Sequence, residues 1–146
     1  MVFDCLIIGG GVSGMQCALV LGSAKNKPFA ASKNIGIIMH QRASHLENAL
    51  FNNVLGLSPK SLGKDILTQG KDQLTTLYSS ISQIEKEKVI SVDEIEGTYF
   101  VNTNKNTYQS KIVILALNYS KPFTIKGLDE FLIPHKKVNI SKDRIQ

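Results

Sequence analysis

The chain has 146 residues, of which 42% are hydrophobic, and a formal net charge of +5. This length and composition are typical of one globular domain with a real core, and they exclude an intrinsically disordered chain. The longest apolar run, Ile112–Leu117, is far shorter than the roughly 20 residues that a membrane-spanning helix needs. No membrane association is therefore predicted.

Charge distribution and cysteine content argue against nucleic-acid binding and against a metal site. The lysines are scattered, and the densest basic group lies in the final segment, 133–146, without interleaved aromatic residues. We interpret that segment as a solvated basic tail, and we predict no specific nucleic-acid site. Cys5 and Cys17 form neither a C-x-x-C motif nor a metal-ligand set, so we predict reduced packing residues, no metal site and a cytoplasmic location.

The first elements in chain order carry the most informative motif. An apolar strand at 2–8 runs into Gly9–Gly14, and a helical pattern follows at 13–24. A G-x-G-x-x-G between a strand and a helix is the dinucleotide-binding fingerprint. Its glycines permit a tight turn at Gly9, close approach of a pyrophosphate at Gly11, and packing of the helix on the strand at Gly14. The predicted cofactor-binding loop comprises Gly9, Gly10, Gly11, Val12, Ser13 and Gly14.

The remaining pattern alternates between strands and helices. After a long, loosely structured stretch that ends near residue 61, the pattern predicts one more helix and further strands. The predicted ranges are a buried strand at 35–39, a helix at 63–79, a strand at 89–95, a hairpin around 99–108 and a central parallel strand, buried on both faces, at 111–117. The fold class predicted is α/β, a doubly wound Rossmann-like domain with a central parallel sheet and a small antiparallel β insertion.

Residues 3–132 resemble the flavin-binding domain of the thioredoxin reductase family. The resemblance rests on the Gly9–Gly14 fingerprint with Ala18 and Gly22, and on the segment 52–56 followed by 63–67. It implies an FAD/NAD(P)-binding domain at 1–132, incomplete relative to the family, with the basic tail at 133–146. The cofactor implied is FAD.

The resemblance also implies roles for three further residues. Asn53 occupies the position of the family's asparagine that touches the flavin. Val89 matches a strand whose backbone meets the adenine. Ala116 lies where the family has an Ala-Thr-Gly turn over the cofactor, although Leu117 and Asn118 replace the Thr-Gly pair here.

The end of the strand at 35–39 departs from the family. The acidic residue expected there to bind the adenosine ribose is absent, and His40, Gln41 and Arg42 follow Met39. His40 or Gln41 can donate or accept a hydrogen bond to the ribose instead. Arg42 is the residue type that a 2′-phosphate site requires, so an NADPH-binding module remains the alternative.

The sequence also lacks the family's nicotinamide-binding domain and its cysteine pair. We therefore expect a fragment, a reduced form, or a chain that works with a second chain or a protein redox partner; an oligomer is compatible with this. The function favoured is a flavin-dependent oxidoreductase domain, with no catalytic residue assigned. A non-catalytic interaction domain that kept the fold is a third possibility.

Overall fold

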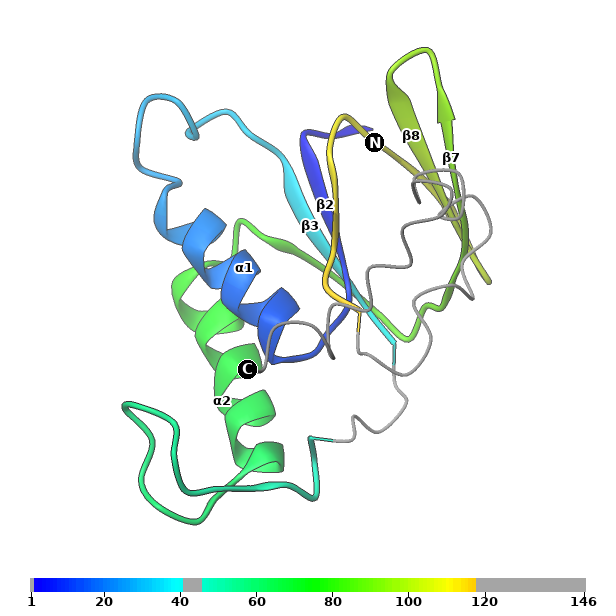
Figure 1. Cartoon of the computed structure of the whole chain (residues 1–146). Helices are drawn as coiled ribbons and strands as arrows, with labels where there is room; N and C mark the ends of the chain where they lie inside the picture. The colour runs from blue at the N-terminus through cyan, green and yellow to red at the C-terminus, as the bar shows by residue number, and fades with distance from the viewer. Residues whose placement is uncertain (1, 41–45, 118–146) are drawn as a thin grey trace, which may run out of the picture.

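The computed structural model describes residues 2–40 and 46–117, and these form three layers. A parallel sheet lies in the middle, two helices cover one of its faces, and a mainly antiparallel sheet packs against the other (Figure 1). The predicted α/β fold class, with a central parallel sheet and a small antiparallel insertion, is confirmed.

The middle sheet is parallel throughout and has the strand order β10-β2-β3-β6. Its members are β2 (Cys5–Ile8), β3 (Ile35–Met39), β6 (Ser82–Glu85) and β10 (Val113–Leu115). Every residue of β2 and β3 is buried, because side chains alternate between the helical layer and the antiparallel layer. β6 was not predicted, since Ile84 is the single apolar residue among its four positions and gives no strand pattern.

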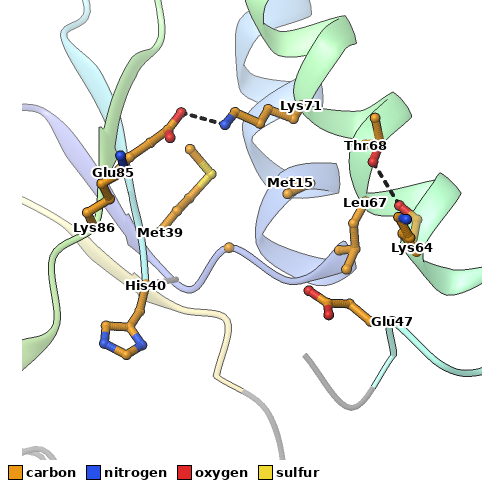
Figure 2. Close-up of a pocket in the computed structure, with 11 residues that line it drawn as sticks. Met15, Met39, His40, Glu47, Lys64, Leu67, Thr68, Lys71, Glu85 and Lys86 are labelled. Carbon is orange, nitrogen blue, oxygen red and sulfur yellow. Dashed lines mark hydrogen bonds and ion pairs between the residues drawn. The ribbon is translucent and has the colours of Figure 1, made fainter. Parts of the chain in front are cut away.

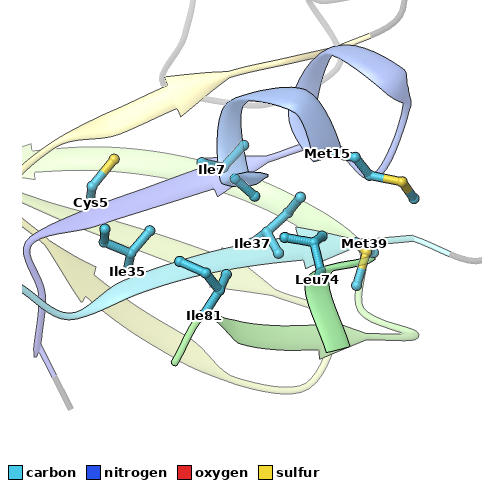
Figure 3. Packing of buried hydrophobic residues seen from close by; sticks show 9 residues of the cluster. Cys5, Ile7, Met15, Ile35, Ile37, Met39, Leu74 and Ile81 are labelled. Atoms are coloured by element: carbon cyan, nitrogen blue, oxygen red, sulfur yellow. The ribbon is translucent and has the colours of Figure 1, made fainter. Parts of the chain in front are cut away.

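The helical layer consists of α1 (Val12–Ser23) and α2 (Gly63–Leu77), which lie side by side (Figure 1). Between them and the sheet is a core that includes Ile7, Ile37 and Leu74, each fully buried (Figure 3). This core fixes the start of α1 over the carboxyl end of β2.

The mainly antiparallel layer has the strand order β1-β9-β8-β7. The pairs β7–β8 and β8–β9 are antiparallel and include the predicted hairpin, whereas β1 pairs with β9 in parallel. Its strands are β1 (Val2–Phe3), β7 (Val89–Ile95), β8 (Thr98–Thr103) and β9 (Thr107–Ser110). The core beneath it joins Phe3, Leu6 and Ile8 to residues of β7 and β8.

Three predicted segments differ from the structure. The single strand at 2–8 is divided at Asp4, whose carboxylate accepts hydrogen bonds from the Asn34 N–H at 2.9 Å and from Lys111 Nζ at 2.8 Å. Because of that bend, β1 leaves the middle sheet and pairs in parallel with β9 of the other sheet.

The strand near 111–117 was predicted to be central and buried on both faces, and this is wrong within the described residues. Among the described residues, β10 is one of the two edge strands of the parallel sheet, and Leu115 within it and Ile112 just before it are 47% and 57% exposed. The stretch predicted to be loosely structured contains a short antiparallel pair, β4 (Leu50–Phe51) and β5 (Ser61–Leu62). Among the described residues, neither helix is long and apolar enough to cross a membrane.

Candidate functional site

In the fingerprint loop, the backbones of β2, of α1 and of the segment that follows β10 are in close contact. Gly9 has a φ of +129°, and a Cβ there would overlap the carbonyl oxygen of Ala116. A Cβ on Gly14 would overlap the carbonyl oxygen of Gly9. The protein's own backbone therefore requires glycine at both positions, as the fingerprint predicts for the turn and for helix packing.

Gly11 is different, because no protein atom lies within 4 Å of the place a Cβ would take. Its φ of −80° and ψ of −179° are ordinary extended values that any residue adopts. Nothing in the surrounding chain requires a glycine here. The absent side chain leaves open space directly beside the start of α1.

The first N–H groups of α1 have no hydrogen-bond acceptor within the part of the chain that the structure describes. Gly11 is its N-cap without a side-chain cap, and the first turn contains no acidic residue. The first backbone bond of the helix runs from the Met15 N–H to the Gly11 oxygen at 2.9 Å, so the N–H groups of Val12, Ser13 and Gly14 precede it. Together with the positive end of the helix dipole, these donors suit an anion such as a pyrophosphate.

A pocket of about 400 Å³ opens beside this loop, at the carboxyl ends of β2, β3 and β6 and against α2 (Figure 2). The crevice at the carboxyl ends of parallel strands is where doubly wound sheets bind ligands. Met15 and Met39 form part of its wall and continue into the core below (Figure 3). The pocket is lined by Gly10, Met15, Met39, His40, Glu47, Lys64, Leu67, Thr68, Lys71, Glu85 and Lys86.

The charged groups of the pocket are of two kinds. Lys71 Nζ and Glu85 Oε1 form an ion pair at 2.9 Å that connects α2 to β6 (Figure 2). The carboxylate of Glu47, in contrast, has no hydrogen-bond or ion-pair partner among the described residues. Within the described part of the chain, the pocket thus has one paired and one unpaired carboxylate.

The structure brings most of the predicted site residues together. The loop residues Gly9–Gly14 lie around the start of α1 with Ala116 against Gly9, and His40 lines the pocket with Gly10. Asn53 is exposed between β4 and β5, and Val89 is buried in the core between the two large sheets. Neither lines the pocket, and Gln41 and Arg42 lie outside the described residues.

Several pocket residues were missed by sequence reasoning. Lys64, Thr68 and Lys71 lie at i, i+4 and i+7 on α2, and that spacing alone indicates a shared helix face. Glu47 and Glu85 gave no comparable signal, because each reaches the pocket through the arrangement of elements distant in sequence.

The two cysteines contribute no redox pair. Both are free, and Cys5 is buried and Cys17 half-buried. Burial raises the pKa of the Cys5 thiol to about 11, with the neighbouring Cys17 adding to the effect, and burial also raises the pKa of Cys17. The thiolate that disulfide exchange requires is therefore suppressed at neutral pH.

Known proteins resemble this chain in sequence and in fold. The family described as pyridine nucleotide-disulphide oxidoreductase matches residues 3–146, whereas no curated protein matches the chain. An oxidoreductase from Agrobacterium tumefaciens is 25% identical, with a TM-score of 0.64, covering 79% of this chain and 36% of that one.

Two thioredoxin reductases share the fold. The enzyme from T. acidophilum is 24% identical with a TM-score of 0.61, covering 78% of this chain and 34% of its own. The enzyme from Gloeobacter violaceus is 20% identical with a TM-score of 0.60, covering 78% and 36%. This chain thus matches little more than a third of the length of any of these three structures.

Proposed function

Because the chain belongs to the pyridine nucleotide-disulphide oxidoreductase family, we propose that it binds FAD as the flavin-binding part of a thioredoxin reductase-like oxidoreductase. The observation that carries the proposal is the open space at Gly11, next to a helix start that has neither a cap nor an acidic residue. A glycine with no steric requirement from the protein fits a backbone that a ligand approaches closely.

The residues of this chain would act by binding and orienting the cofactor. The N–H groups of Val12, Ser13 and Gly14 would hold the pyrophosphate, and the pocket beside Gly10 would accommodate the adenosine half. When bound, the flavin supplies the electron-transfer chemistry. We assign no acid, base or nucleophile to the described residues. The electron partner would be a second chain, a protein or a small molecule.

An NADPH-binding module is the second candidate, and one observation favours it. The residue after β3 is His40 rather than an acid, and three lysines line the adjacent pocket. Positive charge without a ribose-binding acid suits a 2′-phosphate. We favour FAD because Ala116, which the resemblance places in the turn over the flavin, lies against Gly9 of the fingerprint loop.

The test is a titration of the 146-residue chain with FAD, followed by flavin fluorescence and the visible absorption spectrum. Gly11→Val would fill the open space and should weaken FAD binding at least about fivefold, since a steric clash with the ligand costs about 1 kcal/mol or more. Ser23→Val places the same side chain at the exposed far end of α1 and should bind like the original chain.

Two outcomes would contradict the proposal. Undiminished FAD affinity in Gly11→Val would show that no pyrophosphate lies at this loop. A colourless chain that binds NADPH but not FAD would favour the second candidate. The cytoplasmic location, the absence of a nucleic-acid partner and the domain boundary at 132 stay predictions.

A further inference from the structure

We propose that Glu47 is the carboxylate that accepts hydrogen bonds from the adenosine ribose hydroxyls, in place of the acid that is missing at the end of β3. The inference rests on the proposed binding of an adenine dinucleotide at Gly9–Gly14. It assigns the ribose site, and with it the discrimination between a free and a phosphorylated ribose, to a residue outside the fingerprint.

The first argument is that Glu47 lies on a rigid support. It belongs to a turn at 46–49 that packs on the start of α2. The Lys64 N–H donates to the backbone carbonyl oxygen of Glu47 at 3.2 Å, and the Gly63 N–H donates to that of Ala49 at 2.9 Å. A Cβ on Gly63 would overlap the carbonyl oxygen of Leu46, so the turn and the helix are in direct backbone contact. A ligand-binding side chain needs such a fixed base.

The second argument is the direction and state of its side chain. Figure 2 shows the Glu47 carboxylate turned from this turn toward the side of the pocket that Met39 and His40 form. Glu47 is half-buried, and none of the described residues donates to its carboxylate. A half-buried carboxylate that faces a pocket and has no protein donor is available to a ligand that supplies donors.

The third argument is chemical complementarity. The 2′- and 3′-hydroxyls of a ribose are two neighbouring donors, and one carboxylate can accept from both. The other acid of the pocket, Glu85, already accepts from Lys71 at 2.9 Å. Glu47 is therefore the carboxylate in this pocket that remains available. Its negative charge would also repel a 2′-phosphate, which favours FAD over NADPH.

The experiment measures binding of ADP and of 2′-deoxy-ADP by calorimetry, because the two probes differ only in the 2′-hydroxyl. We expect the original chain to bind ADP about tenfold more tightly, the size expected for a hydrogen bond to a charged acceptor. In Glu47→Gln that ratio should fall to about threefold or less, since the acceptor becomes neutral. Glu85→Gln is the matched control, from the same pocket, and should keep the original ratio.

The ratio separates a ribose contact from a merely structural effect, because a general loosening of the pocket weakens both probes alike. An unchanged ratio in Glu47→Gln, with ADP binding still abolished by Gly11→Val, would overturn the role of Glu47 and leave the proposed cofactor site intact. A ratio that falls in Glu85→Gln instead would transfer the role to Glu85. Failure of the original chain to bind either ADP or FAD would overturn the proposed function and this inference together.

Discussion

Two glutamates on opposite sides of the sheet show how a structural region differs from a binding region. Glu87 is 7% exposed and accepts hydrogen bonds from Thr103 Oγ1 at 2.6 Å, Asn106 Nδ2 at 2.8 Å and the Tyr108 hydroxyl at 3.0 Å. These donors come from β8, β9 and the turn between them, so Glu87 ties the hairpin to the segment before β7. Glu47, at the pocket, has no such donors among the described residues.

The same contrast separates two glycines of the fingerprint. Gly14 is surrounded by backbone, whereas Gly11 faces open space. Glu87 and Gly14 have their contacts within the protein, so they stabilise the fold. The carboxylate of Glu47 lacks donors and Gly11 lacks neighbouring atoms among the described residues, and a bound ligand would supply these contacts.

The largest effect should come from exchanging the two glycines for alanine. Gly14→Ala forces a methyl group into the Gly9 carbonyl oxygen, and we expect it to destabilise the fold by about 3 kcal/mol. Gly11→Ala, at an N-cap with open space around it, should cost less than about 1 kcal/mol. Urea unfolding of the two variants measures this difference. Equal losses would mean that the loop has no distinct ligand-facing side.

Replacing the structural glutamate, Glu87, should also destabilise the fold more than replacing Glu47. We expect this difference in stability to be smaller than the difference between the two glycine variants. Glu87→Ala leaves the donors of Thr103, Asn106 and Tyr108 without their acceptor, and we expect a loss of about 2–3 kcal/mol. Glu47→Ala removes no side-chain hydrogen bond or ion pair among the described residues, so it should change stability by less than about 0.5 kcal/mol. Thermal unfolding without ligand would contradict the comparison if Glu47→Ala proved the more damaging change.

Acid should lower the stability of the fold, because it protonates two carboxylates, those of Asp4 and Glu87, whose pKa values are lowered by folding. Burial alone would raise the pKa of Glu87, but its three hydrogen bonds outweigh that effect and hold the pKa below the usual 4.5. The hydrogen bonds from Lys111 and the Asn34 backbone lower the pKa of Asp4 from 3.8 to about 2. Since folding lowers both values, the stability they contribute is fully present above about pH 5 and is lost as the pH falls toward 2.

Unfolding curves between pH 7 and pH 2 check this dependence. Asp4→Asn and Glu87→Gln should each be less stable at neutral pH and show a flatter decline in acid than the original chain. A stability that stays constant down to pH 2 would mean that neither carboxylate gains from its partners. A decline that both variants reproduce in full would assign the acid sensitivity to other groups.

Local sequence patterns were sufficient to predict the elements around the cofactor loop. The strand at 35–39 was predicted at its observed bounds, and α1 was predicted within one residue at each end. In both, a strong apolar pattern is bounded by glycine or polar residues, so local and tertiary preferences agree. The fingerprint likewise places Gly9 and Gly14 correctly, because their requirement for glycine comes from neighbours fixed by the strand–turn–helix unit.

The errors arose where distant segments decide the outcome. Asp4 interrupts the first strand because Asn34 and Lys111, far away in the chain, anchor its carboxylate. Burial of the strand at 111–117 on both faces was inferred from its hydrophobicity, yet the order of strands places it at an edge of the described sheet. The pocket position of Glu47 depends on the contact between its turn and α2, which no local pattern encodes.

The smallest effect should come from the ion pair at the pocket, which tests how far the comparison extends. Lys71 and Glu85 are 47% and 39% exposed, so water and salt screen their attraction, and a double-mutant cycle with Lys71→Met and Glu85→Gln should give a coupling of about 0.2–1 kcal/mol. In 1 M salt the coupling should fall further, because the screening length shortens to about 3 Å. A coupling above about 2 kcal/mol that salt does not reduce would mean that this ion pair stabilises the fold, as the hydrogen bonds of Glu87 do. The wall of the pocket between α2 and β6 would then belong to the fold, and only the side formed by Gly11 and Glu47 would remain for the ligand.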